Sequence, residues 1–115
     1  MNIESVKSLF RLFSGEDDIE KYTPFIELAI TETEKMLLPD ADKTDVRLSF
    51  LGAAIANHRF VQFESARDRT QITYGGKMLT DSSENLIANS EKLLRDYLEI
   101  CSDLISPRVF TFTGV

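Results

Sequence analysis

The apolar residues near the N-terminus recur every three or four positions, as they do along one face of a helix. They begin at Ile3 and end at Phe13, with Val6, Leu9 and Phe10 between them. Ser14-Gly15 follows, and glycine readily adopts the left-handed conformation that closes a helix. The pattern therefore predicts a short amphipathic helix over residues 3–13.

A second apolar stripe with the same period runs from Ile19 to Leu37, after the acidic residues 16–18, which suit the positive end of a helix dipole. Pro24 interrupts this stripe, and proline is comfortable in a helix only within the first turn. Either Thr23 caps a new helix with Pro24 at its first position, or one helix is kinked at Pro24. We prefer the cap at Thr23, preceded by a short turn.

A third helix is expected to begin after a cap at Thr44 and to end near Phe63, with apolar residues from Val46 to Val61 on its buried face. Its centre, Gly52-Ala53-Ala54-Ile55-Ala56, consists largely of small residues, which let another helix approach closely. Close packing within one core is the commoner use of such a stretch. The alternative is contact with a second subunit.

The pattern changes in the segment that follows. Gln71-Ile72-Thr73-Tyr74 alternates polar and apolar residues, and Gly75-Gly76 suits a two-residue turn before Lys77-Met78-Leu79. This segment predicts a small β-hairpin from Gln71 to Leu79. Because an isolated hairpin is marginally stable in water, it must pack on the helices, pair with another strand or await a partner.

Asp81-Ser82-Ser83-Glu84 has the form of a capping box, and the apolar stripe beyond it continues to Ile105. We expect the longest helix there, ended by Ser106-Pro107. In the tail, aromatic and hydroxyl residues alternate, so that Phe110 and Phe112 lie on the same side of an extended strand.

Together these elements predict an all-α fold, a small bundle of about four helices with a short β-hairpin-like linker and an extended C-terminal strand or arm. The length of 115 residues fits a single helical domain over 1–115, with arms at about 70–80 and 107–115. A hydrophobic fraction of 43% is typical of chains that fold. No apolar stretch reaches the ~20 residues that cross a bilayer, and the first residues lack a secretory pattern, so we expect cytosolic synthesis and no membrane contact.

The net charge of -6 argues against general affinity for nucleic acid. The charge is uneven: residues 1–42 carry four basic and ten acidic side chains, whereas residues 43–80 carry six basic and three acidic ones. A solvated surface is the simpler interpretation of this pattern. The alternative is that basic and acidic faces of identical neighbours meet in an oligomer.

The residues that usually perform chemistry are scarce. His58 is the single histidine and Cys101 the single cysteine, so a cysteine-rich metal site is excluded, and a zinc site is not expected. Both residues lie on apolar stripes, which favours core packing over a general base or a nucleophile. Asp40, Asp42 and Asp45 lack the glycine and the distal glutamate of a calcium loop. We therefore predict no enzyme activity, no metal and no cofactor.

Interaction with other proteins is the function that these observations leave. Aromatic side chains are the usual anchors of interfaces, and arginine is also frequent there. The candidate interaction residues fall in the end of the third helix, the hairpin and the tail: Phe60, Phe63, Arg67, Arg69, Ile72, Tyr74, Phe110 and Phe112.

The order of a short helix, the acidic helix "GEDDIEKYTPFIELAITETEKML", the helix "TDVRLSFLGAAIANHRFVQF", the linker "TQITYGGKML" and the helix "SENLIANSEKLLRDYLEIC" resembles the small head-tail connector (head completion or adaptor) proteins of tailed bacteriophages and prophages. The resemblance covers nearly the whole chain and rests on helix order and apolar texture. The short tail and Pro24 depart from the family pattern.

This resemblance implies a structural protein of the virion head-tail junction, made in the cytoplasm of the bacterial host. It implies a ring homo-oligomer that contacts the portal protein and a tail-side completion protein, with DNA only as passing cargo. The hairpin from Gln71 to Leu79 and the tail from Val109 to Thr113 would then be the arms that face neighbours. The alternative is a small helical regulatory protein that binds nucleic acid through the region from Arg59 to Arg69, where basic and aromatic residues interleave.

Overall fold

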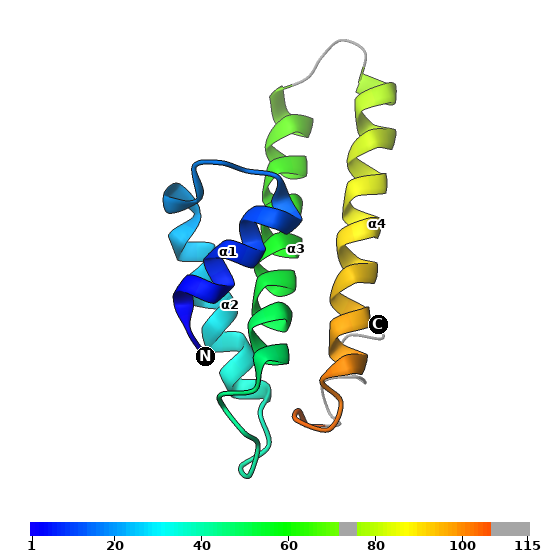
Figure 1. The fold of residues 1–115 in the computed structure, drawn as a ribbon. Helices are drawn as coiled ribbons and strands as arrows, with labels where there is room; N and C mark the ends of the chain where they lie inside the picture. The colour runs from blue at the N-terminus through cyan, green and yellow to red at the C-terminus, as the bar shows by residue number, and fades with distance from the viewer. Residues whose placement is uncertain (72–75, 107–115) are drawn as a thin grey trace.

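A computed structural model of the chain describes residues 1–71 and 76–106, and within the helices it leaves the side chains of 68–83 undescribed. In these ranges the protein is all-α, as predicted, with helices α1 (Ile3–Ser14), α2 (Thr23–Met36), α3 (Val46–Gln71) and α4 (Gly76–Ile100) and a 3-10 turn, η1 (Ile19–Tyr22). Figure 1 shows α3 in the middle, with α1 and α2 on one side of it and α4 on the other.

The end of α1 and the restart of the chain at Pro24 follow the signals in the sequence, whereas the cap of α1 at Asn2 was not predicted and Thr23 does not cap α2. The Asn2 side chain accepts a hydrogen bond from the Glu4 backbone N–H and caps α1. Gly15, with φ of 73°, closes α1, and its N–H donates to the Arg11 carbonyl at 2.9 Å. At Pro24 the chain forms the short turn η1 and then a new helix, rather than one kinked helix, and α2 begins at Thr23 itself.

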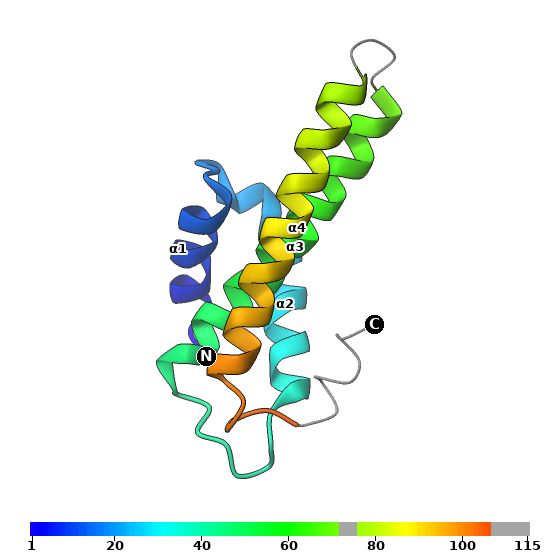
Figure 2. The ribbon, with the colours of Figure 1, turned by 90° about the vertical axis from the view of Figure 1, so that its right-hand side faces the viewer.

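Helix α3 is buried on all sides in its first half and on one side in its second half. Residues 48–57 are all buried except Phe50, because α1, α2 and α4 all pack against this part. Beyond Phe60 only Ser65 is buried among the residues whose side chains are described. Figure 2 shows the reason: α3 and α4 continue together past the end of α1 and α2.

The small residues of α3 serve close packing inside the monomer, which was the simpler of the two interpretations. Ala53, Ala54 and Ala56 have no exposed surface. A Cβ placed on Gly52 would lie 3.7 Å from Val6 of α1 and 3.6 Å from Thr33 of α2. The glycine therefore lies where α1 and α2 both approach α3.

The expected β-hairpin from Gln71 to Leu79 is not formed as predicted. Gln71 is the last residue of α3, and Lys77, Met78 and Leu79 belong to the first turns of α4. Residues 72–75 lie outside the described ranges. The elements that flank them are two long antiparallel helices, so that this part of the chain is a helical hairpin.

The predicted ends of the two long helices were also wrong. Helix α3 runs to Gln71 instead of Phe63, and α4 begins at Gly76, so the capping box at Asp81–Glu84 lies inside the helix. Local sequence signals for an end or a start therefore do not set the bounds of these two helices. Helix α4 ends at Ile100, and turns cover residues 101–104 before Ile105.

The chain end that is described returns to α2 through backbone hydrogen bonds. The Leu38 N–H donates to the Leu104 carbonyl at 3.0 Å, and the Ser106 N–H donates to the Met36 carbonyl at 2.8 Å. Leu37 and Ile105 form an isolated antiparallel bridge, and no strand is present in residues 1–71 and 76–106. The predicted terminal strand falls on residues 107–115, which lie outside the described part.

The core is one cluster of apolar side chains to which all four helices contribute. At its centre are three rings, with Phe10 and Tyr22 each in edge contact with Phe60 at centroid distances of 5.7 and 4.8 Å. These rings join α1, η1 and α3. Such pairs stabilise by about 0.5–1.5 kcal/mol beyond the area that they bury.

Candidate partner-binding groove

The two aromatics predicted to anchor a partner at the end of the third helix lie in different environments. Phe60 is 6% exposed and belongs to the central ring cluster, so little of its surface can contact another molecule. Phe63 is 48% exposed, with its ring 5.5 Å from that of Phe25 and below the Arg67 guanidinium. Of this pair, Phe63 is the residue placed to contact a partner.

Two of the arginines that interleave with these aromatics are held by carboxylates. Arg59 pairs with Glu32 of α2 at 3.2 Å, and Arg67 pairs with Glu64 one turn earlier in α3. Arg69 lies in α3, but its side chain is outside the description. The predicted interaction residues Ile72, Tyr74, Phe110 and Phe112 also fall outside the described ranges.

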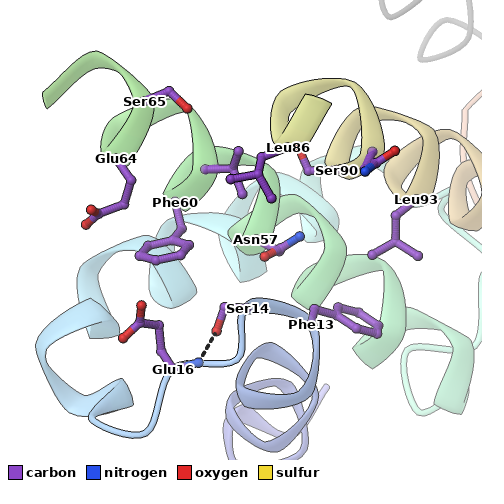
Figure 3. A pocket seen from close by; sticks show the side chains of 12 residues that line it. Phe13, Ser14, Glu16, Asn57, Phe60, Glu64, Ser65, Leu86, Ser90 and Leu93 are labelled. Atoms are coloured by element: carbon purple, nitrogen blue, oxygen red, sulfur yellow. Dashed lines mark hydrogen bonds between the residues drawn. The ribbon is translucent and has the colours of Figure 1, made fainter. Parts of the chain in front are cut away.

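A groove lies between the end of α1 and the middle parts of α3 and α4. Its volume is about 400 Å³, and Figure 3 shows the side chains around it. The turn after α1 contributes Glu16, and α4 contributes Leu86, which is 57% exposed. The remaining apolar lining comes from Phe13, Phe60, Val61 and Leu93.

The groove holds two buried oxygen atoms without a hydrogen-bond partner in the described structure. One is Oδ1 of Asn57, a residue that is 5% exposed, and the other is Oε1 of Glu64. The second oxygen of Glu64 accepts from Arg67. Figure 3 shows the Asn57 amide in the middle of the groove, with Glu16 and Glu64 together at one end. Because a buried polar atom without a partner costs about 1–3 kcal/mol, both atoms need an explanation.

A second groove lies across α3 from the first one, between α2, α3 and α4, with a volume of about 470 Å³. Met36, Ile55, Leu94 and Leu98 form its apolar lining. Four of its charged side chains form pairs, Arg59 with Glu32 at 3.2 Å and Arg95 with Glu91 at 2.6 Å, and Lys35 also lines it. The second groove thus has basic side chains in its lining, whereas the 12 described lining residues of the first groove include none.

His58 connects α3 to α4 between the two grooves. Its Nδ1 lies 2.9 Å from the Ser90 hydroxyl oxygen, and that hydroxyl donates to the Ile87 carbonyl. The Ser90 oxygen therefore accepts from an Nδ1–H of His58. Burial lowers the pKa of His58, Glu91 raises it, and Arg59 lowers it further. His58 is thus a partly buried packing residue with a partner, as its place on the apolar stripe indicated.

Cys101 is fully buried and packs in the core cluster, which agrees with its position on an apolar stripe. Its Sγ lies 3.6 Å from the Arg47 carbonyl oxygen. Burial raises the pKa of the thiol. The thiolate that a nucleophilic cysteine requires is therefore disfavoured.

The aspartates between α2 and α3 are engaged in local contacts. Asp42 accepts from both the backbone N–H and the hydroxyl of Thr44, and Asp45 accepts from Arg47. Among the residues that the structure describes, no group of three or more potential ligands could hold a metal ion. None of the helices, as far as they are described, is long and apolar enough to cross a membrane.

The sequence interpretation did not identify Asn57, although a signal was present. Asn57 directly follows the apolar run 53–56 and lies two helical turns before Glu64, on the same side of α3. A polar residue at a buried position of an otherwise apolar stretch marks a specific contact. The sequence pattern alone could not show that α1 and α4 leave a groove over Asn57.

Comparison with protein-family models, with curated proteins and with solved structures finds no match to this chain.

Proposed function

We propose that this chain is a non-catalytic structural adaptor of a phage head-tail junction, which assembles as a ring on the portal protein. Large apolar side chains that the fold leaves exposed on α3 and α4 carry this proposal. Phe63 and Leu86 are 48% and 57% exposed, although each continues an apolar stripe that is buried nearer the middle of its helix.

The physical argument rests on where these side chains lie. A monomer gains little stability from large apolar side chains that stay about half exposed. Exposed large apolar surface can mark a contact site for another protein. Leu86 also adjoins a groove, which adds concave surface beside it.

The shape of the protein also supports an adaptor. Its extents are 52 × 31 × 17 Å, because α3 and α4 are about 39 and 37 Å long at 1.5 Å per residue. A flat, elongated subunit presents broad faces to neighbours in a ring, while its ends remain for the portal and the tail-side completion protein. The predicted C-terminal arm, residues 107–115, stays a prediction of this proposal.

The proposal is tested by native mass spectrometry and light scattering over a concentration series of the full chain, alone and with the portal protein. We expect oligomers whose population grows with concentration, and a complex with the portal ring. A chain that stays strictly monomeric and has no affinity for the portal would contradict the proposal.

A further inference from the structure

We propose that the groove between α1, α3 and α4 binds an arginine or lysine side chain carried by an extended segment of a different protein. The inference rests on the proposed function, because it names the chemistry by which a partner at the junction would recognise this face. It is carried by the unpartnered oxygens of Asn57 and Glu64.

The two oxygens define what the ligand must supply. Asn57 and Glu64 are seven residues apart, so they lie on one side of α3 about 10 Å from each other along its axis. A carboxylate can only accept hydrogen bonds, and Asn57 also presents its carbonyl oxygen unpartnered. The matching ligand therefore donates at both positions, as a basic side chain and a neighbouring backbone N–H of an extended segment do.

The charge of the groove favours a cationic donor over a neutral one. Glu16 lines the same end as Glu64, and none of the 12 lining residues in this described region is basic. Arg67, the arginine that neutralises Glu64 in part, is bound to its other oxygen. A guanidinium or ammonium group would form charge-assisted hydrogen bonds there, which are about twice as strong as neutral ones.

The apolar walls suit the rest of such a side chain. Arginine and lysine carry aliphatic stems that pack against apolar surface while the head group reaches a polar site. Leu86 and Leu93 of α4 provide that surface, and Phe13 adds an aromatic ring. A groove of about 400 Å³ is also within the size range of specific binding sites.

Charge complementarity favours another protein over a second copy of this chain. Each copy has a net charge of -6, so a second copy brings net negative charge to an acidic groove, while copies in a ring can still meet through other faces. A basic segment of a different protein is attracted to the acidic groove instead.

The test uses the full chain and a short fluorescent peptide of alternating leucine and arginine. A matched peptide carries citrulline, which keeps the shape of arginine without its charge. We expect anisotropy titrations to show at least about tenfold weaker binding of the citrulline peptide, as loss of a charge-assisted hydrogen bond predicts. In ¹⁵N spectra the arginine peptide should shift the side-chain amide signal of Asn57.

Matched variants locate the site. Glu16→Gln with Glu64→Gln should weaken arginine-peptide binding about tenfold or more, whereas Glu32→Gln with Glu91→Gln, which changes the net charge equally in the other groove, should have a much smaller effect. Asn57→Leu should abolish binding while the midpoint of thermal unfolding stays the same or rises. Asn57→Leu still tests the proposal if the variant that combines Glu16→Gln with Glu64→Gln folds poorly.

Three results would overturn the inference and leave a groove that holds solvent. They are equal binding of the two peptides, no binding of either peptide, and changes in the ¹⁵N spectra that are confined to residues of the second groove. Loss of self-association in the Glu16 and Glu64 variant would also overturn it, because the occupant would then be a second copy. The peptide assay needs no portal protein. A wild-type ring that forms on the portal without peptide binding therefore overturns only this inference, whereas a monomer without portal affinity overturns the proposed function.

Discussion

Gly52 and Asn57 show how single residues of α3 depart from the apolar pattern around them for different physical reasons. Gly52 is small because the side chains of α1 and α2 come within van der Waals distance of the place where a Cβ would lie. Asn57 is polar at a position where its neighbours are alanine and isoleucine, and its oxygen faces a groove. The first departure serves packing, and we infer that the second serves binding.

Substitutions at Gly52 should separate size from backbone effects. In Gly52→Ala the nearest atom to the new Cβ is the Met1 Sδ at 3.3 Å, the end of a flexible side chain that can move. Because alanine favours helix interiors over glycine by roughly 0.5–1 kcal/mol, we expect an equal or slightly higher free energy of unfolding. Gly52→Leu should lower it by about 1–3 kcal/mol through overpacking, as measured by urea denaturation. A strongly destabilised alanine variant would contradict this packing.

The pH dependence of stability between 7.5 and 5.5 should report on His58, the single histidine. Its pKa in the folded protein is lowered below 6.5, first by burial and then by Arg59, against the opposing effect of Glu91. The unfolded chain therefore takes up the proton first, and the free energy of unfolding should fall as the pH drops through 6.5. In His58→Gln this fall should be smaller. Identical pH profiles from urea denaturation would contradict the assignment.

At the scale of elements, the turn between α2 and α3 and the end of α4 are joined by one arginine. Arg47 pairs with Asp45 and with Asp103, each at 2.9 Å, and it also donates to the Ile100 carbonyl. These contacts satisfy a carbonyl at the C-terminal end of α4 that has no partner within the helix. Arg47 lowers the pKa of both aspartates by hydrogen bonding.

Arg47→Gln should therefore lower the midpoint of thermal unfolding and increase hydrogen exchange at the backbone amides of residues 101–104. The matched control is Arg95→Gln, which removes an exposed pair with Glu91 four residues earlier in α4. Exposed pairs of this kind contribute little to stability. Equal effects of the two variants by calorimetry would show that Arg47 does not join these elements.

At the scale of the whole molecule, α3 and α4 are longer than the body needs. Figures 1 and 2 both show them extending past α1 and α2. Phe63 of α3 and Leu86 of α4 are 48% and 57% exposed. Folding of the monomer thus leaves large apolar side chains of both long helices exposed.

Phe63→Ser combined with Leu86→Ser should impair assembly while leaving the helical content nearly unchanged, because both side chains contribute little to the core. Leu28→Ser is the matched control, since Leu28 is 51% exposed but lies on α2 rather than on α3 or α4. Light scattering at several concentrations measures the assembly of each variant. Circular dichroism checks that each variant is folded. Equal assembly of both variants would argue against this surface as the interface.

The sequence by itself determined the features that depend on nearby residues. The left-handed conformation at Gly15 and the restart of the chain at Pro24 follow from local backbone geometry, so the end of α1 and the start of α2 were predictable. The period of the apolar stripes likewise predicted the all-α class, the core position of Cys101 and the packing role of the partly buried His58.

Only the tertiary structure decided which local signals prevail and which polar groups meet. Helix α4 includes Lys77–Leu79, where the sequence pattern favoured a hairpin, and Asp81, where it favoured a helix start, so the fold as a whole prevails over these local signals. Phe60 became a core residue because Phe10 and Tyr22 reach it from distant parts of the chain. The groove above Asn57 exists for the same reason: its walls come from three helices whose arrangement no local pattern specifies.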